Sequence, residues 1–128
     1  MRKIKFRGKS NLDNKWHYGY YFVGKNEGTE TIVDDDFNFH LGINENTLGQ
    51  FTGLFDKNGV EIYEGDILGR HGFWEWYVSY EDGGFRKVPT NSVQKINWEH
   101  SLLEQDTLEH WEVIGNIHDN PELLKGDK

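Results

Sequence analysis

Oxygen-bearing side chains between residues 34 and 45 have the spacing of a calcium-binding loop. Four of them occupy positions 1, 3, 5 and 12 of an EF-hand pattern: Asp34, Asp36, Asn38 and Glu45. Oxygens at alternate positions can wrap a hard cation such as Ca²⁺. However, the sixth position, which needs Gly for a sharp turn, is Phe39, and no amphipathic helix flanks the segment. We therefore interpret it as an acidic surface loop and expect no metal site.

A second pair of carboxylates, Glu64 and Asp66, flanks Gly65 and could carry out general acid–base chemistry. The surrounding residues favour a turn instead, in which an Asp side chain accepts hydrogen bonds from nearby backbone N–H groups. Nucleophilic chemistry has less support, because the chain has no Cys and neither Ser79 nor Ser101 stands in a G-x-S-x-G context. We expect no catalytic residue and no enzymatic activity.

The His residues are scattered, at positions 17, 40, 71, 100, 110 and 118. None of them pair at the spacings by which one strand or helix presents two ligands to a metal. His110 and His118 flank the last expected strand and could meet another His in space. The glycines punctuate expected hairpins and do not open a helix, so no phosphate-cradling loop is present. We expect structural or surface roles for the His residues and no cofactor.

The densest aromatic stretch is the strongest candidate for a partner-binding surface. It contains four rings: Phe73, Trp74, Trp76 and Tyr77. Alternation along a strand sends the first and last of them to one face and the two Trp rings to the other. Exposed rings could anchor a protein partner or stack on nucleobases. The alternative is that the two Trp rings and Val78 form the core, while the Phe and Tyr rings pack under a loop.

Charge is unevenly distributed along the chain. The formal net charge is −8, which disfavours binding to a phosphate backbone unless the cations gather on one face. Five cations do lie in the first nine residues: Arg2, Lys3, Lys5, Arg7 and Lys9. Nucleic-acid binding through this basic strand therefore stays an alternative. The simpler interpretation is that the basic strand pairs beside acidic segments.

The composition predicts a mostly β fold. Aromatic residues make up 15% of the 128-residue chain, and they suit the half-buried surface of a sheet. Fifteen Gly and only two Pro favour tight turns between short strands. The length fits one domain over residues 1–128. No apolar run reaches membrane-spanning length, and no apolar h-region follows the basic N-terminus, which is therefore not a signal peptide, so we expect a cytoplasmic protein.

Turn residues divide the chain into short strands. We expect strands at residues 3–7, 16–23, 29–33, 67–70, 73–80, 85–88, 92–98 and 111–117. Four alternating apolar residues could attach the segment 34–46 to the core: Phe37, Phe39, Leu41 and Ile43. Residues 102–108 fit either a short helix or a loop. Asn120 followed by Pro121 predicts a short helical turn with Asn120 as its N-cap.

Three stretches of the sequence resemble the YopX family of small proteins encoded by phages and prophages. They are Arg2–Arg7, the turn-rich signature Gln50–Ile67 with its Asp56-Lys57-Asn58-Gly59 turn, and Glu112–Ile117 followed by Asn120–Leu123. The resemblance implies a small SH3-like barrel or roll, which agrees with the hairpins expected from the sequence and with a short C-terminal helical turn. It implies no catalytic motif, and the family has no assigned biochemical role.

We therefore expect a non-enzymatic phage or prophage accessory protein in the cytoplasm of a phage-infected or lysogenic bacterial host. Its most favoured partner is a host or phage protein. Nucleic-acid binding through the N-terminal strand and exposed rings is the alternative, and an enzyme ranks last. Strand edges also permit a homo-oligomer, and we expect no membrane association.

Overall fold

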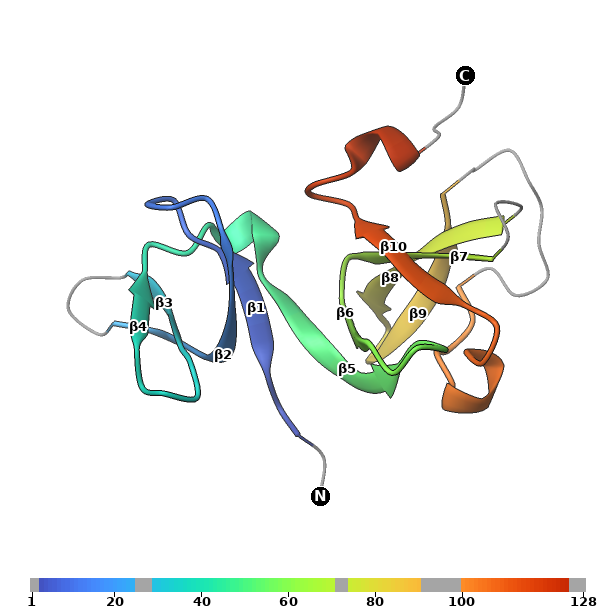
Figure 1. Ribbon diagram of the computed structural model, residues 1–128, viewed down its shortest axis with the longest axis horizontal. Coiled ribbons are helices and arrows are strands. Elements are labelled where there is room, and N and C mark those ends of the chain that lie inside the picture. Colours follow the sequence, from blue (N-terminus) through green and yellow to red (C-terminus); the bar gives the residue numbers. More distant parts are fainter. Residues whose placement is uncertain (1–2, 25–28, 71–73, 91–99, 125–128) are drawn as a thin grey trace. The chain divides into compact units, whose positions relative to one another are not determined.

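The strands form because aromatic and β-branched runs alternate with turn residues that accept positive φ angles. A computed structural model describes residues 3–24, 29–70, 74–90 and 100–124 (Figure 1). The strands in these ranges are β1 (Phe6–Lys9), β2 (Trp16–Val23), β3 (Glu30–Val33), β4 (Phe39–Leu41), β5 (Gly49–Phe55), β6 (Glu61–Tyr63), β7 (Asp66–Arg70), β8 (Trp74–Glu81), β9 (Gly84–Pro89) and β10 (Glu112–Asn116). Three short 3₁₀ helices complete the description: η1 (Glu45–Thr47), η2 (Gln105–Thr107) and η3 (Pro121–Leu123).

The prediction of a mostly β fold built from antiparallel hairpins is therefore confirmed. The expected SH3-like barrel is not: the described strands form two antiparallel sheets, and no closed barrel is found among them. The chain divides into two compact units, Met1–Phe51 and Thr52–Lys128. Within the described residues, no helix is long and apolar enough to cross a membrane.

In the first unit the strands run in the order β4-β3-β2-β1-β5, with the start of β5 pairing with β1. Its buried apolar residues include Ile32 and Ile43. Gly8 in β1 allows this packing, because a Cβ atom there would lie 2.4 Å from the Cγ2 atom of Ile43. The first strand covers Phe6–Lys9 where residues 3–7 were predicted, and Ile4 is exposed.

The alternating apolar residues after β3 do not all reach the core as expected. Phe37, Phe39 and Leu41 are exposed, and only Ile43 is buried. The pairs Val33↔Phe39 and Thr31↔Leu41 place the apolar positions of β4 on the outer side of the sheet. Gly42 then takes a φ of 70°, which breaks the strand alternation before Ile43 and lets that side chain turn inward.

In the second unit a four-stranded sheet has the order β10-β7-β8-β9. One buried apolar cluster holds it together: Ile62, Leu68, Trp76, Val78 and Leu108. Trp76 also packs edge-on against Trp111, with 5.5 Å between ring centroids. The predicted hairpin of β8 and β9 and the predicted closing strand are both present.

Other local predictions have mixed outcomes. The open choice for residues 102–108 resolves into the single 3₁₀ turn η2. The C-terminal helical turn is confirmed as η3, but Asn120 does not cap it. Its side-chain oxygen instead accepts a hydrogen bond from the backbone N–H of Asn116, at 3.1 Å. The strand predicted at 92–98 lies outside the described residues.

The Asp56-Lys57-Asn58-Gly59 turn is organised by the buried carboxylate of Asp56. Its Oδ1 atom accepts hydrogen bonds from the backbone N–H groups of Asn58 at 2.8 Å and Val60 at 2.9 Å. Its Oδ2 atom accepts a third, at 3.0 Å, from the N–H of Val113 in β10. Gly59 supplies the positive φ that the turn requires. One side chain thus joins the β5–β6 turn to the last strand.

Replacing Asp56 by Asn should destabilise the fold. The amide NH₂ group cannot accept a hydrogen bond, so at least one of the three backbone N–H groups loses its acceptor. We expect the free energy of unfolding to fall by about 1–3 kcal/mol, measured by denaturant unfolding. The exposed Asp106→Asn is the matched control and should change stability by less than about 0.5 kcal/mol. Equal stabilities for both variants would contradict this role of Asp56.

Candidate functional site

Of the four predicted aromatic binding residues, the structure describes the side chains of Trp76 and Tyr77. Trp76 is fully buried in the core of the second unit, as the alternative interpretation required, and Val78 is buried beside it. Tyr77 is half-buried, and burial, followed by the nearby Glu81 charge, raises the pKa of its hydroxyl. Phe73 and the side chain of Trp74 lie outside the described residues.

The acidic residues considered for metal binding or catalysis have structural partners. Asp66 is buried, and its Oδ2 atom accepts a hydrogen bond of 2.7 Å from the backbone N–H of Tyr63, so it caps its turn as expected. Asp34 accepts hydrogen bonds from the backbone of its own loop. Among the described residues, no group of three or more His, Asp or Glu side chains is placed to hold a metal ion.

The cations of the N-terminal strand lie against aromatic rings of the same unit. The guanidinium of Arg7 is 4.7 Å from the centre of the Trp16 ring, and the Lys9 ammonium is 5.7 Å from the same ring. Lys5 lies over Phe51. Arg7 is buried. These positive charges are therefore arranged along aromatic surfaces within the unit.

A different set of side chains, four aromatic rings and one Leu, forms an exposed surface on the first unit. We call this surface the aromatic face. It consists of Tyr18, Tyr20, Phe22, Phe39 and Leu41, all exposed. The first three alternate along β2 and so share one side of the sheet. Pairing through β3 brings β4 to the same side, since Tyr20 lies opposite Val33 and Val33 opposite Phe39.

The aromatic face extends across β2 and β4, and its own side chains carry no charge, while Arg7 of β1 lies opposite Tyr18 at its border. Phe22 and Phe39 meet edge to face, with 6.1 Å between ring centroids. The β3 residues on this side, Thr31 and Val33, carry no charge. Tyr20 on the inner strand β2 is 63% exposed and Phe39 on the edge strand β4 is 62% exposed, so large rings on both strands face water. Such contiguous exposed apolar surfaces mark interaction sites in soluble proteins.

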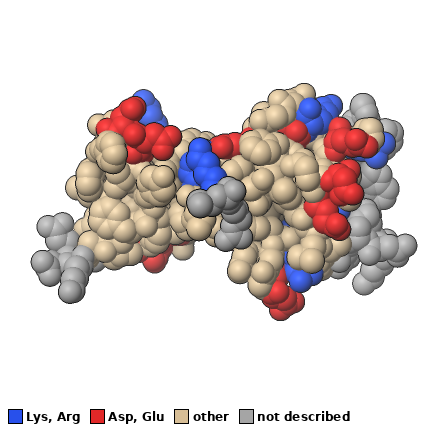
Figure 2. Space-filling model, turned by 90° about the horizontal axis from the view of Figure 1, so that it is seen from below, with Lys and Arg blue, Asp and Glu red and all other residues tan. Residues whose placement is uncertain are grey.

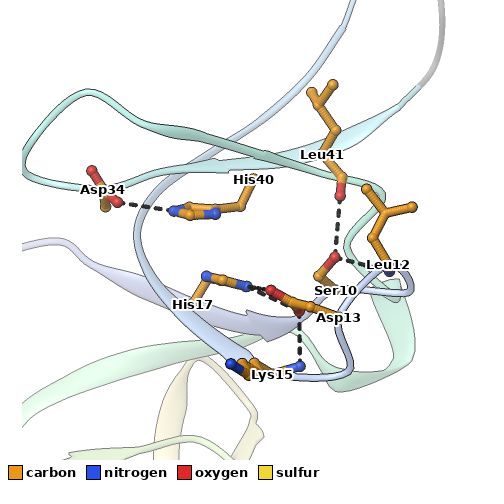
Figure 3. A network of polar contacts seen from close by, with 8 residues as sticks. All are labelled: Ser10, Leu12, Asp13, Lys15, His17, Asp34, His40 and Leu41. Atoms are coloured by element: carbon orange, nitrogen blue, oxygen red, sulfur yellow. Dashed lines mark hydrogen bonds and ion pairs between the residues drawn. The ribbon is translucent and has the colours of Figure 1, made fainter.

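On the opposite side of β2 and β4, two His side chains form a stacked pair. The rings of His17 and His40 lie 3.9 Å apart, with 17° between their planes (Figure 3). The Nε2 atom of each ring contacts a carboxylate oxygen at 2.9 Å, His17 with Asp13 and His40 with Asp34. The pair thus connects the β1–β2 turn with the β3–β4 turn.

Hydrogen bonds from these turns stabilise the ionised forms of both carboxylates. His40 is the largest cause that lowers the pKa of Asp34, to about 2, followed by the backbone N–H of Asn38. The backbone N–H of Lys15 is the largest cause that lowers the pKa of Asp13. Both Asp side chains are therefore ionised at neutral pH, and they hold the two turns that frame the aromatic face.

Sequence reasoning missed both the His pair and the aromatic face. His17 and His40 are far apart in the sequence, so only the strand register brings them together. The alternation of Tyr18, Tyr20 and Phe22 was visible in the sequence. It could have indicated a two-sided strand, because His17 and Gly19 alternate with these rings.

The fold and this surface define a small antiparallel β protein with two units, one of which exposes aromatic side chains on its sheet. The YopX protein family matches residues 5–125, and the chain belongs to that family. It is also similar to the crystal structure of protein EF1440 from Enterococcus faecalis, with 25% sequence identity and a TM-score of 0.64. That match covers 98% of this chain and 100% of EF1440. No curated protein matches the sequence.

The Asp34–His40 contact predicts a pH dependence of stability. The pKa of Asp34 is about 2 in the folded chain and about 3.9 in an unfolded one. Because folding lowers this pKa, the carboxylate stabilises the fold above about pH 4, and this contribution is lost as the pH falls toward 2. His40→Gln should raise the pKa of Asp34 and make stability less dependent on pH in that window.

Carboxyl ¹³C NMR of Asp34, together with unfolding at several acid pH values, measures both effects. The exposed His110→Gln in the second unit is the control and should leave the Asp34 titration unchanged. An Asp34 pKa that is the same in wild type and His40→Gln would contradict the assigned cause.

Proposed function

We propose that this chain is a non-enzymatic binding module that contacts a host or phage protein through the aromatic face of its first unit. The observation that carries the proposal is the exposure of several large rings on one continuous, uncharged side of β2 and β4. Keeping such rings in water costs free energy that burial against a partner recovers. Tyr and Phe also lose little side-chain entropy on binding.

Charge favours a protein over a nucleic acid as the partner. The net charge is −8, and three cations of the N-terminal segment lie over aromatic rings: Arg7 and Lys9 over Trp16, and Lys5 over Phe51. On the molecular face in Figure 2, Asp and Glu side chains gather in groups, while Lys and Arg side chains are scattered. A nucleic acid would meet this acidic surface with repulsion.

The polar residues that could do chemistry support a binding role in place of catalysis. Asp56, Asp66 and Asp34 direct their carboxylates at backbone N–H groups of their own turns. Ser79 contacts Glu81 at 3.4 Å, and His100 contacts another oxygen of the same Glu, so the two do not form a nucleophile–base pair. We place the protein in the bacterial cytoplasm, as an accessory factor of a phage or prophage.

Affinity capture from lysogenic or infected cells with matched variants tests the proposal. The double variant Tyr20→Thr/Phe39→Thr removes two exposed rings and keeps β propensity. The control is Tyr80→Thr, which removes an exposed ring from the second unit. We expect proteins captured by the wild type and by the control to be absent from the double variant. Equal capture by all three would contradict the proposal, as would salt-dependent binding to oligonucleotides.

A further inference from the structure

Phe37 occupies an unfavourable position in two independent respects. It lies between β3 and β4 with a φ of 64°, in the left-handed region where a bulky side chain is strained. Its ring is also 81% exposed to water. Gly or Asn would satisfy this backbone conformation at lower cost, and a polar residue would suit the exposure. Neither the conformation nor the exposure of Phe37 is explained by the stability of the fold.

The turn that presents Phe37 is held firmly by its neighbours. The Phe37 N–H donates to the carbonyl of Asp34 at 2.9 Å, and the Asp34 N–H donates to the carbonyl of Asn38 at 3.0 Å. The Asp34 carboxylate also accepts hydrogen bonds from the N–H groups of Asp36 and Asn38. His40 fixes the same carboxylate from β4. The ring is therefore presented by a turn whose conformation is set before binding, which lowers the entropic cost of association.

The surroundings of Phe37 indicate the chemistry of its partner. Phe39, two residues further along, belongs to the aromatic face, so Phe37 adjoins that face in the chain. The residues directly before Phe37 are Asp35 and Asp36, both exposed. Asp34 is ionised at neutral pH because its pKa lies at about 2. An apolar ring is thus bordered by negative charge on its N-terminal side.

We propose that Phe37 is the anchor of the interface: it enters an apolar pocket on the partner protein, and Lys or Arg side chains at the rim of that pocket pair with Asp35 and Asp36. This inference rests on the proposed function and specifies the partner surface. Aromatic anchors in pockets contribute most of the binding energy of many interfaces, and charges at the rim mainly raise the association rate. A second copy of this acidic chain fits less well, because it would bring like charges together.

Phe37→Gly is the test, because strain and binding predict opposite effects of the substitution. Gly accepts the left-handed φ, so we expect a melting temperature equal to or above that of the wild type. The protein that the wild type captures, purified, should bind this variant at least about tenfold more weakly. Leu12→Gly is the matched control, because Leu12 is an 84% exposed apolar residue in another turn, where φ is not positive. It should bind like the wild type.

The charge component is tested with Asp35→Asn/Asp36→Asn. We expect slower association and a weaker dependence of affinity on salt, with little change in melting temperature. If the salt dependence of the affinity is unchanged, the proposal that Lys or Arg side chains surround the partner's pocket is wrong. Should Phe37→Gly lose stability, Phe37→Asn, which also tolerates this conformation, provides the same comparison.

The remaining outcomes separate this inference from the proposed function. If the Tyr20→Thr/Phe39→Thr variant loses binding but Phe37→Gly binds fully, Phe37 is not the anchor, and the aromatic face is still the binding surface. Full binding by both variants would overturn both. A wild-type dimer that Phe37→Gly converts to a monomer in sedimentation would overturn the inference in favour of a second copy.

Discussion

The second unit depends on the hydrogen bonds that the buried carboxylate of Asp56 accepts. This carboxylate accepts hydrogen bonds from two N–H groups of its own turn and from the N–H of Val113, which lies 57 residues further along the chain. A buried carboxylate requires such donors, since an unpaired charge in the interior is costly. The signature of the YopX family therefore marks how the fold is closed. Its Asp and Gly residues set turns and strand pairing, and they are not the residues we assign to binding.

The first unit uses polar contacts where a larger unit would use a bigger apolar core. One side of its sheet buries Ile32 and Ile43 and includes the stacked His17 and His40. The Asp side chains that hold this His pair belong to the turns at the ends of β1–β2 and β3–β4. On the other side of the same sheet Arg7 and Thr31 are buried, whereas the rings of β2 and β4 are exposed. Because the buried Ile residues and the Asp–His contacts hold the strands together on one side, the rings on the opposite side can stay exposed without loss of the fold.

Local features of the fold could be predicted from the sequence, and features that depend on register could not. The limits of β2, the β8–β9 hairpin and the Asp56 turn follow from alternation and turn chemistry within a few residues. The burial of Trp76 and the exposure of Phe39 depend on which strands pair and which side is covered. Alternation alone cannot distinguish the two sides of a strand. A single left-handed Gly42 was enough to separate Ile43 from the exposed residues before it.

In this protein the Gln50–Ile67 signature builds the fold, and we propose that the aromatic face binds the partner. A saturation mutagenesis library scored both for folded abundance and for binding to the captured partner tests these roles most directly. We predict that substitutions at Asp56 and Asp66 lower abundance and binding together. Substitutions at Tyr20, Phe22 and Phe39 should lower binding while abundance is kept. The opposite result would contradict these roles: signature variants that stay abundant but lose binding, together with aromatic-face variants that bind normally.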